Sequence, residues 1–239
     1  MIIWYLILDD TEGRILMAFV KSFNNQSLGE EISNAVSHGI GMLLSIAGTA
    51  VLIVMAVMRS SAIGVVSASL YGASLIIMYL FSTLYHSITN FKAKKVFQIF
   101  DHCSIYLLIV GTYIPISLVM LGKLQGMPAL GWTIFGINSA CMLLGIILNA
   151  VNLEKYKKIT LALDIIMGWL IIFSIRYVWN QVGLGGMVYM VTGGLAYTVG
   201  ILFYKMKKTK YMHFVWHLFV LLGSIMHYFF VLFYCYPEI

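Results

Sequence analysis

The sequence predicts an all-α polytopic membrane protein whose core is a bundle of seven transmembrane helices. Of its 239 residues, 61% are hydrophobic and 10% are charged, and the mean hydropathy is +0.93. A soluble domain of this length has too little interior to hide so much apolar surface. Seven apolar stretches are long enough to cross a hydrocarbon core, which takes about 20 helical residues, and none alternates as a barrel strand would. They cover residues 34–58, 62–86, 97–120, 130–151, 159–180, 184–204 and 213–235.

Residues 1–33 precede this domain and are predicted to form a poorly defined N-terminal cytoplasmic segment. The run MIIWYLIL is too short to span a membrane and lacks the basic region of a signal peptide. We expect either that Met17 is the true start or that this stretch lies along the membrane surface. The seven-helix domain occupies residues 34–239, and its short loops make consecutive helices antiparallel neighbours.

The basic residues predict the orientation of the bundle. Of the 15 Lys and Arg residues, 12 lie in the N-terminal tail and in the second, fourth and sixth loops. Positive charge marks the cytoplasmic side, so the N-terminus is expected inside the cell and the C-terminus outside. The net charge of +6 is then mostly a cytoplasmic rim. We interpret this rim as a topology signal that contacts anionic lipid headgroups, and not as a nucleic-acid site.

Ionisable and other polar side chains gather near the cytoplasmic ends of the predicted helices, whereas a random distribution would place them at both ends. In chain order they are Glu31, Asn34 and His38 in EEISNAVSHG, Ser82 and His86 in FSTLYH, Asp101 and His102 in FDHCS, Asp164 early in the fifth span, and His213 and His217 in MHFVWH. His227 lies about 15 Å deeper than His217 at the helical rise per residue. We interpret it as a structural or proton-relay histidine.

His213 and His217 predict a metal site. Positions i and i+4 lie about 40° apart on a helix face, so both rings can aim at one point. Imidazole is costly to bury in hydrocarbon unless it binds a metal ion or hydrogen-bonds another polar group. His86, at the same predicted depth, would be a third nitrogen ligand, and three such ligands suit a catalytic zinc ion. The alternative is that each histidine hydrogen-bonds a neighbouring carbonyl or hydroxyl group.

Asp101 and Ser82 are the predicted catalytic partners of this site. Asp101 would accept the proton of a water that the metal activates, or would orient a ligand histidine. Ser82 would hydrogen-bond that water or a substrate carbonyl, or would bond back to its own helix. The second choices for the site are His38, His102, His227 and Asp164.

Three packing features are also expected. Pro115 should bend the third helix. Gly186, Gly193 and Gly200 form a seven-residue stripe that favours close helix packing. The tyrosines and tryptophans are interpreted mostly as interfacial belt and lipid contacts.

These motifs resemble those of the hemolysin III family, the bacterial branch of the progestin and adipoQ receptor superfamily. The matching runs are EEISNAVSHGIG, STLYH, FDHCSIYLLIVGTYIP and the H-x-x-x-H that precedes His227. The resemblance implies seven helices in a bacterial inner membrane and a zinc ion near the cytoplasmic face. Its ligands would be His86, His213 and His217, with Asp101 and Ser82 beside it.

The resemblance leaves two main classes of function open. The superfamily's receptors and the related alkaline ceramidases imply a zinc-dependent hydrolase of lipid amides or esters, with a role in membrane-lipid homeostasis. The family name implies a cytolytic, pore-forming or transport protein. The outer half of the bundle is too apolar to line an aqueous channel, which disfavours a pore. A receptor or sensor with a structural metal is a third hypothesis.

Overall fold

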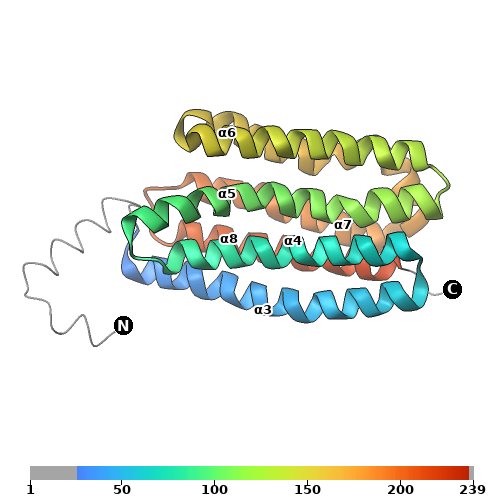
Figure 1. Cartoon of the computed structure of the whole chain (residues 1–239), viewed down its shortest axis with the longest axis horizontal. Coiled ribbons are helices and arrows are strands. Elements are labelled where there is room, and N and C mark those ends of the chain that lie inside the picture. Colours follow the sequence, from blue (N-terminus) through green and yellow to red (C-terminus); the bar gives the residue numbers. More distant parts are fainter. Residues whose placement is uncertain (1–25, 237–239) are drawn as a thin grey trace, which may run out of the picture.

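The computed structural model describes residues 26–236, which fold into long helices that run side by side (Figure 1). The helices are α3 (Leu28–Arg59), α4 (Ala62–Ser87), α5 (Phe91–Ile114), α6 (Pro128–Trp169), α7 (Ile175–Lys205) and α8 (Met212–Phe230). Three short segments extend them, namely η1 (Pro115–Leu124) after α5, η2 (Leu170–Ser174) between α6 and α7, and η3 (Val231–Cys235) after α8. The prediction of an all-α polytopic membrane protein is confirmed.

Two helices begin earlier than the apolar spans predict. Helix α3 starts at Leu28 because Ser27 and Glu30 form a reciprocal capping box, in which Ser27 N–H donates to the Glu30 carboxylate at 2.8 Å. Helix α5 starts at Phe91, where the Asn90 side chain accepts a hydrogen bond from the backbone of Ala93 at 3.1 Å. A prediction from hydropathy leaves out such first turns because their residues are polar. The extra turns place Glu31 and Lys94 inside helices.

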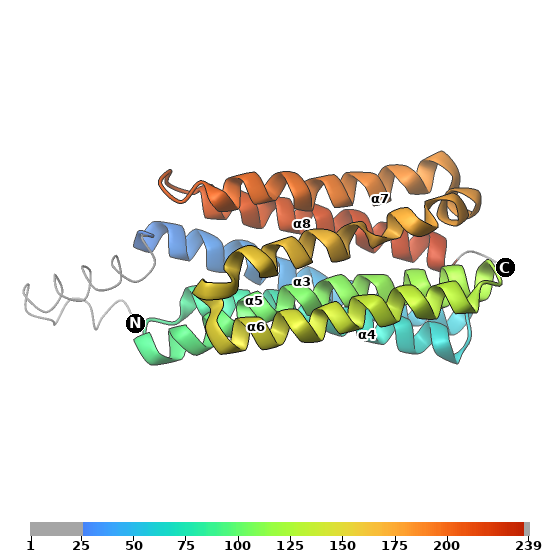
Figure 2. The same ribbon diagram turned by 90° about the horizontal axis from the view of Figure 1, so that it is seen from above.

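The seven predicted spans fall within five apolar helical stretches of the structure. Five stretches of the described chain are long and apolar enough to cross a membrane, and one of them is the 78-residue region Pro128–Lys205. Its backbone breaks at Asn152 (φ −165°, ψ 95°) and at Gly183, whose φ of 56° favours glycine. Both breaks lie between predicted spans, and the ribbon turns back near each, at opposite ends of the bundle (Figure 2). The seven-span count and the orientation stay predictions.

Close helix contacts at glycines hold the bundle together. A Cβ atom at Gly200 would lie 2.7 Å from the Trp216 ring, and one at Gly193 would overlap the ring of His227. A Cβ atom at Gly186 would lie 3.2 Å from the Tyr234 ring. The stripe predicted to pack closely therefore faces α8 and η3, and small residues let the helix backbones approach.

The interpretation of the tyrosines as belt residues is wrong for a buried set. The rings of Tyr71, Tyr79, Tyr106, Tyr113 and Tyr236 are at most 5% exposed. Three of their hydroxyl groups donate to backbone carbonyls: Tyr106 to Thr160 at 3.0 Å, Tyr113 to Gly168 at 2.9 Å and Tyr236 to Gly64 at 3.1 Å. A buried hydroxyl is tolerated when it finds such a partner. By contrast, Trp132 and Trp179 are half exposed on the outer surface, as expected for lipid contact.

Pro115 changes the helix without ending it. The α-helical pattern of α5 stops at Ile114, and the chain continues as the π-helical segment η1 from Pro115 to Leu124. Proline has no N–H to donate to the preceding turn, so the regular ladder cannot pass through it. A Cβ atom at Gly131 would overlap the carbonyl oxygen of Ser117, so this segment lies directly against the start of α6.

Candidate metal centre

His86, His213 and His217 meet at one end of the bundle. One possible ligand nitrogen of each ring lies within 4.8 Å of the corresponding atoms of the other two. His86 comes from the last turn of α4, and the other two come from the first turns of α8. The ring centroids are 4.7 to 5.2 Å apart. Three residues that are up to 131 positions apart in sequence, from 86 to 217, are thus close enough to hold one metal ion.

The neighbours of two of these rings leave one nitrogen of each for a ligand. Nδ1 of His86 lies 2.7 Å from Oε2 of Glu31, and its buried Nε2 has no hydrogen-bond partner among the described residues. Nδ1 of His217 lies 3.2 Å from the Asn34 carbonyl oxygen and 3.3 Å from Ser37 Oγ. A histidine that donates from one nitrogen to oxygen presents the lone pair of the other. His86 and His217 therefore each keep one nitrogen for a ligand, and with His213 they could hold a metal ion.

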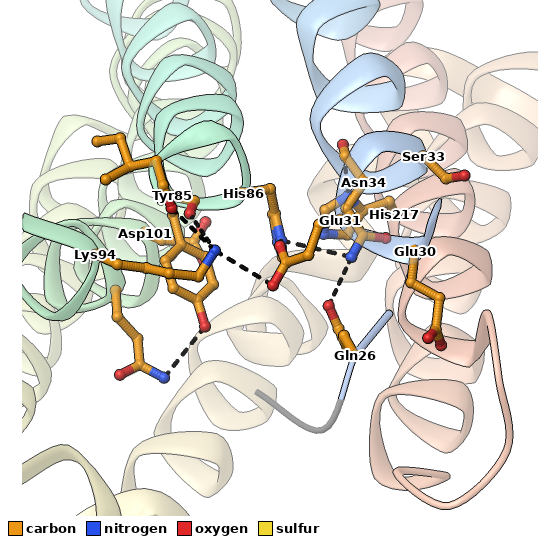
Figure 3. A network of polar contacts seen from close by, with 12 residues as sticks. Gln26, Glu30, Glu31, Ser33, Asn34, Tyr85, His86, Lys94, Asp101 and His217 are labelled. Atoms are coloured by element: carbon orange, nitrogen blue, oxygen red, sulfur yellow. Dashed lines mark hydrogen bonds and ion pairs between the residues drawn. The ribbon is translucent and has the colours of Figure 1, made fainter. Parts of the chain in front are cut away.

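A buried ion pair adjoins His86 (Figure 3). Glu31 Oε1 lies 3.2 Å from Nζ of Lys94, and the two side chains are 6% and 9% exposed. Lys94 also donates to the carbonyl oxygens of Tyr85 at 3.0 Å and Ile88 at 3.4 Å. Charge patterning predicts Lys94 as part of the basic rim, and for this residue that prediction is wrong. It is buried because its three N–H groups find oxygen partners inside the protein.

Ser82 and Asp101 line the same cavity as His213 and His217. Most of the remaining wall is apolar and includes Leu108, Ile109, Leu161, Ile165 and Val220. Asp101 lies beside His102, with 3.7 Å between Oδ2 and Nδ1. The structure therefore brings both predicted catalytic residues to the cavity, and their chemical roles stay predictions. Glu31 makes a polar contact with the His86 ring, and Asn34 and Ser37 make polar contacts with the His217 ring.

The second-choice residues are distributed along the cavity. His38 is 3% exposed and stacks against His217, so it belongs to the cluster. His102 Nδ1 lies 2.9 Å from the Gln98 carbonyl oxygen of its own helix. Asp164 lines the wall contributed by the second part of α6. His227 lies 3.2 Å from the Met190 carbonyl oxygen on α7, away from the three clustered histidines, as a structural histidine would.

Sequence reasoning missed Ser37 and Lys94. Ser37 is one helical turn from Asn34, and this spacing on the same face was the available signal. Lys94 stands beside Lys95 in an otherwise ordinary basic run, so no local signal distinguished the buried lysine from the exposed one.

Comparison with known proteins gives a consistent match over nearly the whole described chain. The family model described as Haemolysin-III related matches residues 26–228. Hemolysin-3 of Bacillus cereus is 43% identical over 212 residues, which is 89% of this chain and 94% of that protein. The Hemolysin-3 homolog of Bacillus subtilis (strain 168) is 40% identical over 209 residues, covering 87% and 96%. The human monocyte to macrophage differentiation factor is 27% identical over 207 residues, covering 84% and 82%.

Proposed function

Because the chain belongs to the haemolysin-III family of multi-pass bacterial membrane proteins, we propose that it is a zinc-dependent hydrolase of lipid amides or esters. The observation that carries this proposal is the meeting of three histidine nitrogens beside a mostly apolar cavity, whose wall includes His213 and His217. A metal site alone would suit a structural role. A metal site that opens onto an apolar cavity with a carboxylate and a hydroxyl group suits chemistry on a lipid.

The proposed metal ligands are His86, His213 and His217. A zinc ion held there would supply a Lewis acid and an activated water at the cavity wall. Two observations support binding of zinc by these residues. The three histidines supply nitrogen donors close together, and the buried Nε2 of His86 has no hydrogen-bond partner within residues 26–236. Binding of a metal ion would account for this unpartnered buried nitrogen.

The remaining steps fall to side chains in the cavity. Asp101 would take a proton from the attacking water and return it to the leaving amine or alcohol as the carbon–nitrogen or carbon–oxygen bond breaks. Ser82 would donate a hydrogen bond to the substrate carbonyl oxygen, which gains negative charge during attack. Leu108, Ile109, Leu161 and Ile165 would surround the acyl chain. The products would be a fatty acid and an amine or alcohol.

The test is metal analysis and lipid hydrolysis with protein purified in detergent. We expect one zinc per chain and release of fatty acid from an N-acyl amide or acyl ester, detected by mass spectrometry. His217→Ala should lose both. His102→Ala is the matched control for zinc content, because it lines the same cavity without joining the three clustered histidines. Absence of stoichiometric zinc, or full activity in His217→Ala, would overturn the proposal.

A cytolytic or transport function is the second candidate, and the printed name of the Bacillus cereus relative, Hemolysin-3, favours it. Unlike the hydrolase proposal, this function does not require the three clustered histidines. Liposomes carrying the wild-type protein should release a trapped dye, and substitution of His86, His213 or His217 should leave this release unchanged. Liposomes that stay sealed would exclude it and leave the hydrolase proposal in place.

A further inference from the structure

Three helix ends are joined by one buried polar network around His86 (Figure 3). Glu31 lies in the first turn of α3, His86 in the last turn of α4 and Lys94 in the first turn of α5. The two oxygens of Glu31 are divided between the other two residues. Oε2 lies 2.7 Å from Nδ1 of His86, and Oε1 lies 3.2 Å from Nζ of Lys94.

Lys94 completes the end of α4. The last carbonyl groups of a helix have no partner within the helix, and a cation there also favours the helix dipole. Lys94 donates to the carbonyl oxygens of Tyr85 and Ile88, on either side of His86 and Ser87. Together with Glu31, this makes three oxygen partners for three N–H groups. The backbone that carries His86 is thereby tied to α5.

The two charges depend on each other. A single buried carboxylate or ammonium group is strongly disfavoured, whereas a buried pair with further hydrogen bonds can be maintained. Glu31 can therefore remain an anion beside His86 because Lys94 balances its charge. An anionic acceptor at Nδ1 fixes both the tautomer and the rotation of the ring. The ring then presents Nε2.

We infer that Glu31 and Lys94 act as one positioning unit for the metal ligand His86, with Glu31 orienting the ring and Lys94 supplying the counter-charge. The inference rests on the metal centre of the proposed function, but it does not depend on hydrolysis. Carboxylate partners of metal-binding histidines commonly change metal affinity about 10- to 100-fold when removed. A network that only held the helix ends together would change stability and leave the affinity of the folded protein unaltered.

The experiment compares zinc affinity and the visible spectrum of the cobalt-substituted protein in detergent. The test variants are Glu31→Gln, Lys94→Met and the double variant. The controls are Glu154→Gln and Lys95→Met, which make the same changes at exposed positions: the Glu154 side chain is 75% exposed, and the Lys95 ammonium group lies over the Phe91 ring. Zinc dissociation constants come from competition with a chelating dye. Thermal unfolding of the metal-free proteins measures stability separately.

We expect Glu31→Gln and Lys94→Met each to weaken zinc binding about 10-fold or more, and to shift the cobalt spectrum. The double variant should be no worse than the more affected single variant, because residues that act as a unit are not additive. Both controls should bind as the wild type does. If a single variant does not fold, the double variant, which removes both charges together, carries the comparison with the wild type.

Two negative results are distinguishable. If the wild type binds zinc and the Glu31 and Lys94 variants bind it as tightly as their controls, the positioning role is wrong and the metal centre stands. A lowered melting temperature with unchanged zinc affinity leads to the same conclusion. If the wild type binds no zinc, the proposed function fails, and the positioning role fails with it.

Discussion

The imidazole ring of His38 lies flat against that of His217, with 3.6 Å between the ring centroids and 9° between the planes. The Tyr79 ring is nearly perpendicular to that of His38, with 5.0 Å between the ring centroids and 86° between the planes. His217 is therefore held by α3 through ring stacking, and by Asn34 and Ser37 through its Nδ1. Of the three clustered histidines, His217 is held in part by stacking and His86 by a carboxylate.

Two substitutions of His38 should distinguish the effect of ring stacking on His217 from the effect of the polar nitrogens of His38. His38→Ala removes the stacked ring and leaves a gap, so it should lower the free energy of unfolding by about 2 kcal/mol and weaken zinc binding. His38→Phe keeps a flat ring against His217 and should retain most of both. Thermal unfolding in detergent and zinc competition give the two values. Equal effects of Ala and Phe would show that the stacked ring itself contributes nothing.

Removing the metal should lower stability in a way that depends on the three histidines. A ligand that binds only the folded protein stabilises it, by about 2.7 kcal/mol at 100 times its dissociation constant. A chelator should therefore lower the melting temperature of the wild type. His213→Ala should melt at the same temperature with or without chelator. A chelator effect of equal size in both proteins would place the metal elsewhere.

Gly193 and His227 are in close contact, so enlarging one residue should destabilise the protein and shrinking the other should compensate. Gly193→Ala puts a methyl group into the space of the His227 ring, and overpacking of this kind typically costs about 1–3 kcal/mol. Adding His227→Ala should recover part of that loss, because the smaller side chain makes room. Gly136→Ala, at an exposed position with no atom within 4 Å of the added Cβ, is the control. Additive losses in the double variant would contradict the contact.

Tyr113 should stabilise the change of helix type between α6 and η2. Its hydroxyl group donates to the Gly168 carbonyl at 2.9 Å and accepts from the Ile171 N–H at 2.9 Å. Tyr113→Phe leaves both buried backbone groups without this partner and should destabilise the protein by about 1–3 kcal/mol. Tyr189→Phe, among the rings of Phe229 and Phe233, is the comparison. The measured quantity is the shift in unfolding temperature, and equal shifts would argue against the bridging role.

Long apolar runs predict the helices well where a span has no polar end. The predicted span 62–86 is nearly the whole of α4, Ala62–Ser87. Hydropathy places the starts of α3 and α5 too late, because their first turns are polar and are stabilised by the capping residues Ser27 and Asn90. It measures preference for hydrocarbon and is blind to a capped polar turn.

For the histidines, too, the sequence predicts one part of the arrangement and the folded chain decides the rest. The spacing of His213 and His217 determined that both rings share a helix face, since i and i+4 positions do so in any α-helix. Depth along its own span predicts that His86 joins them, and the folded chain places the three nitrogens within 4.8 Å. Depth alone could not say which way each ring turns. The orientation depends on Glu31, Asn34 and Ser37, all on α3.

By itself, the sequence determined the membrane environment and the helical class through its composition, the shared face of His213 and His217 through their spacing, and the family through its motifs. Tertiary structure alone decided which charged residues are buried. Lys94 and Lys95 are adjacent and chemically identical, yet Lys94 is buried and pairs with Glu31, while Lys95 is exposed. Burial of a charge requires a partner brought from another helix, and only packing of the three helix ends provides one.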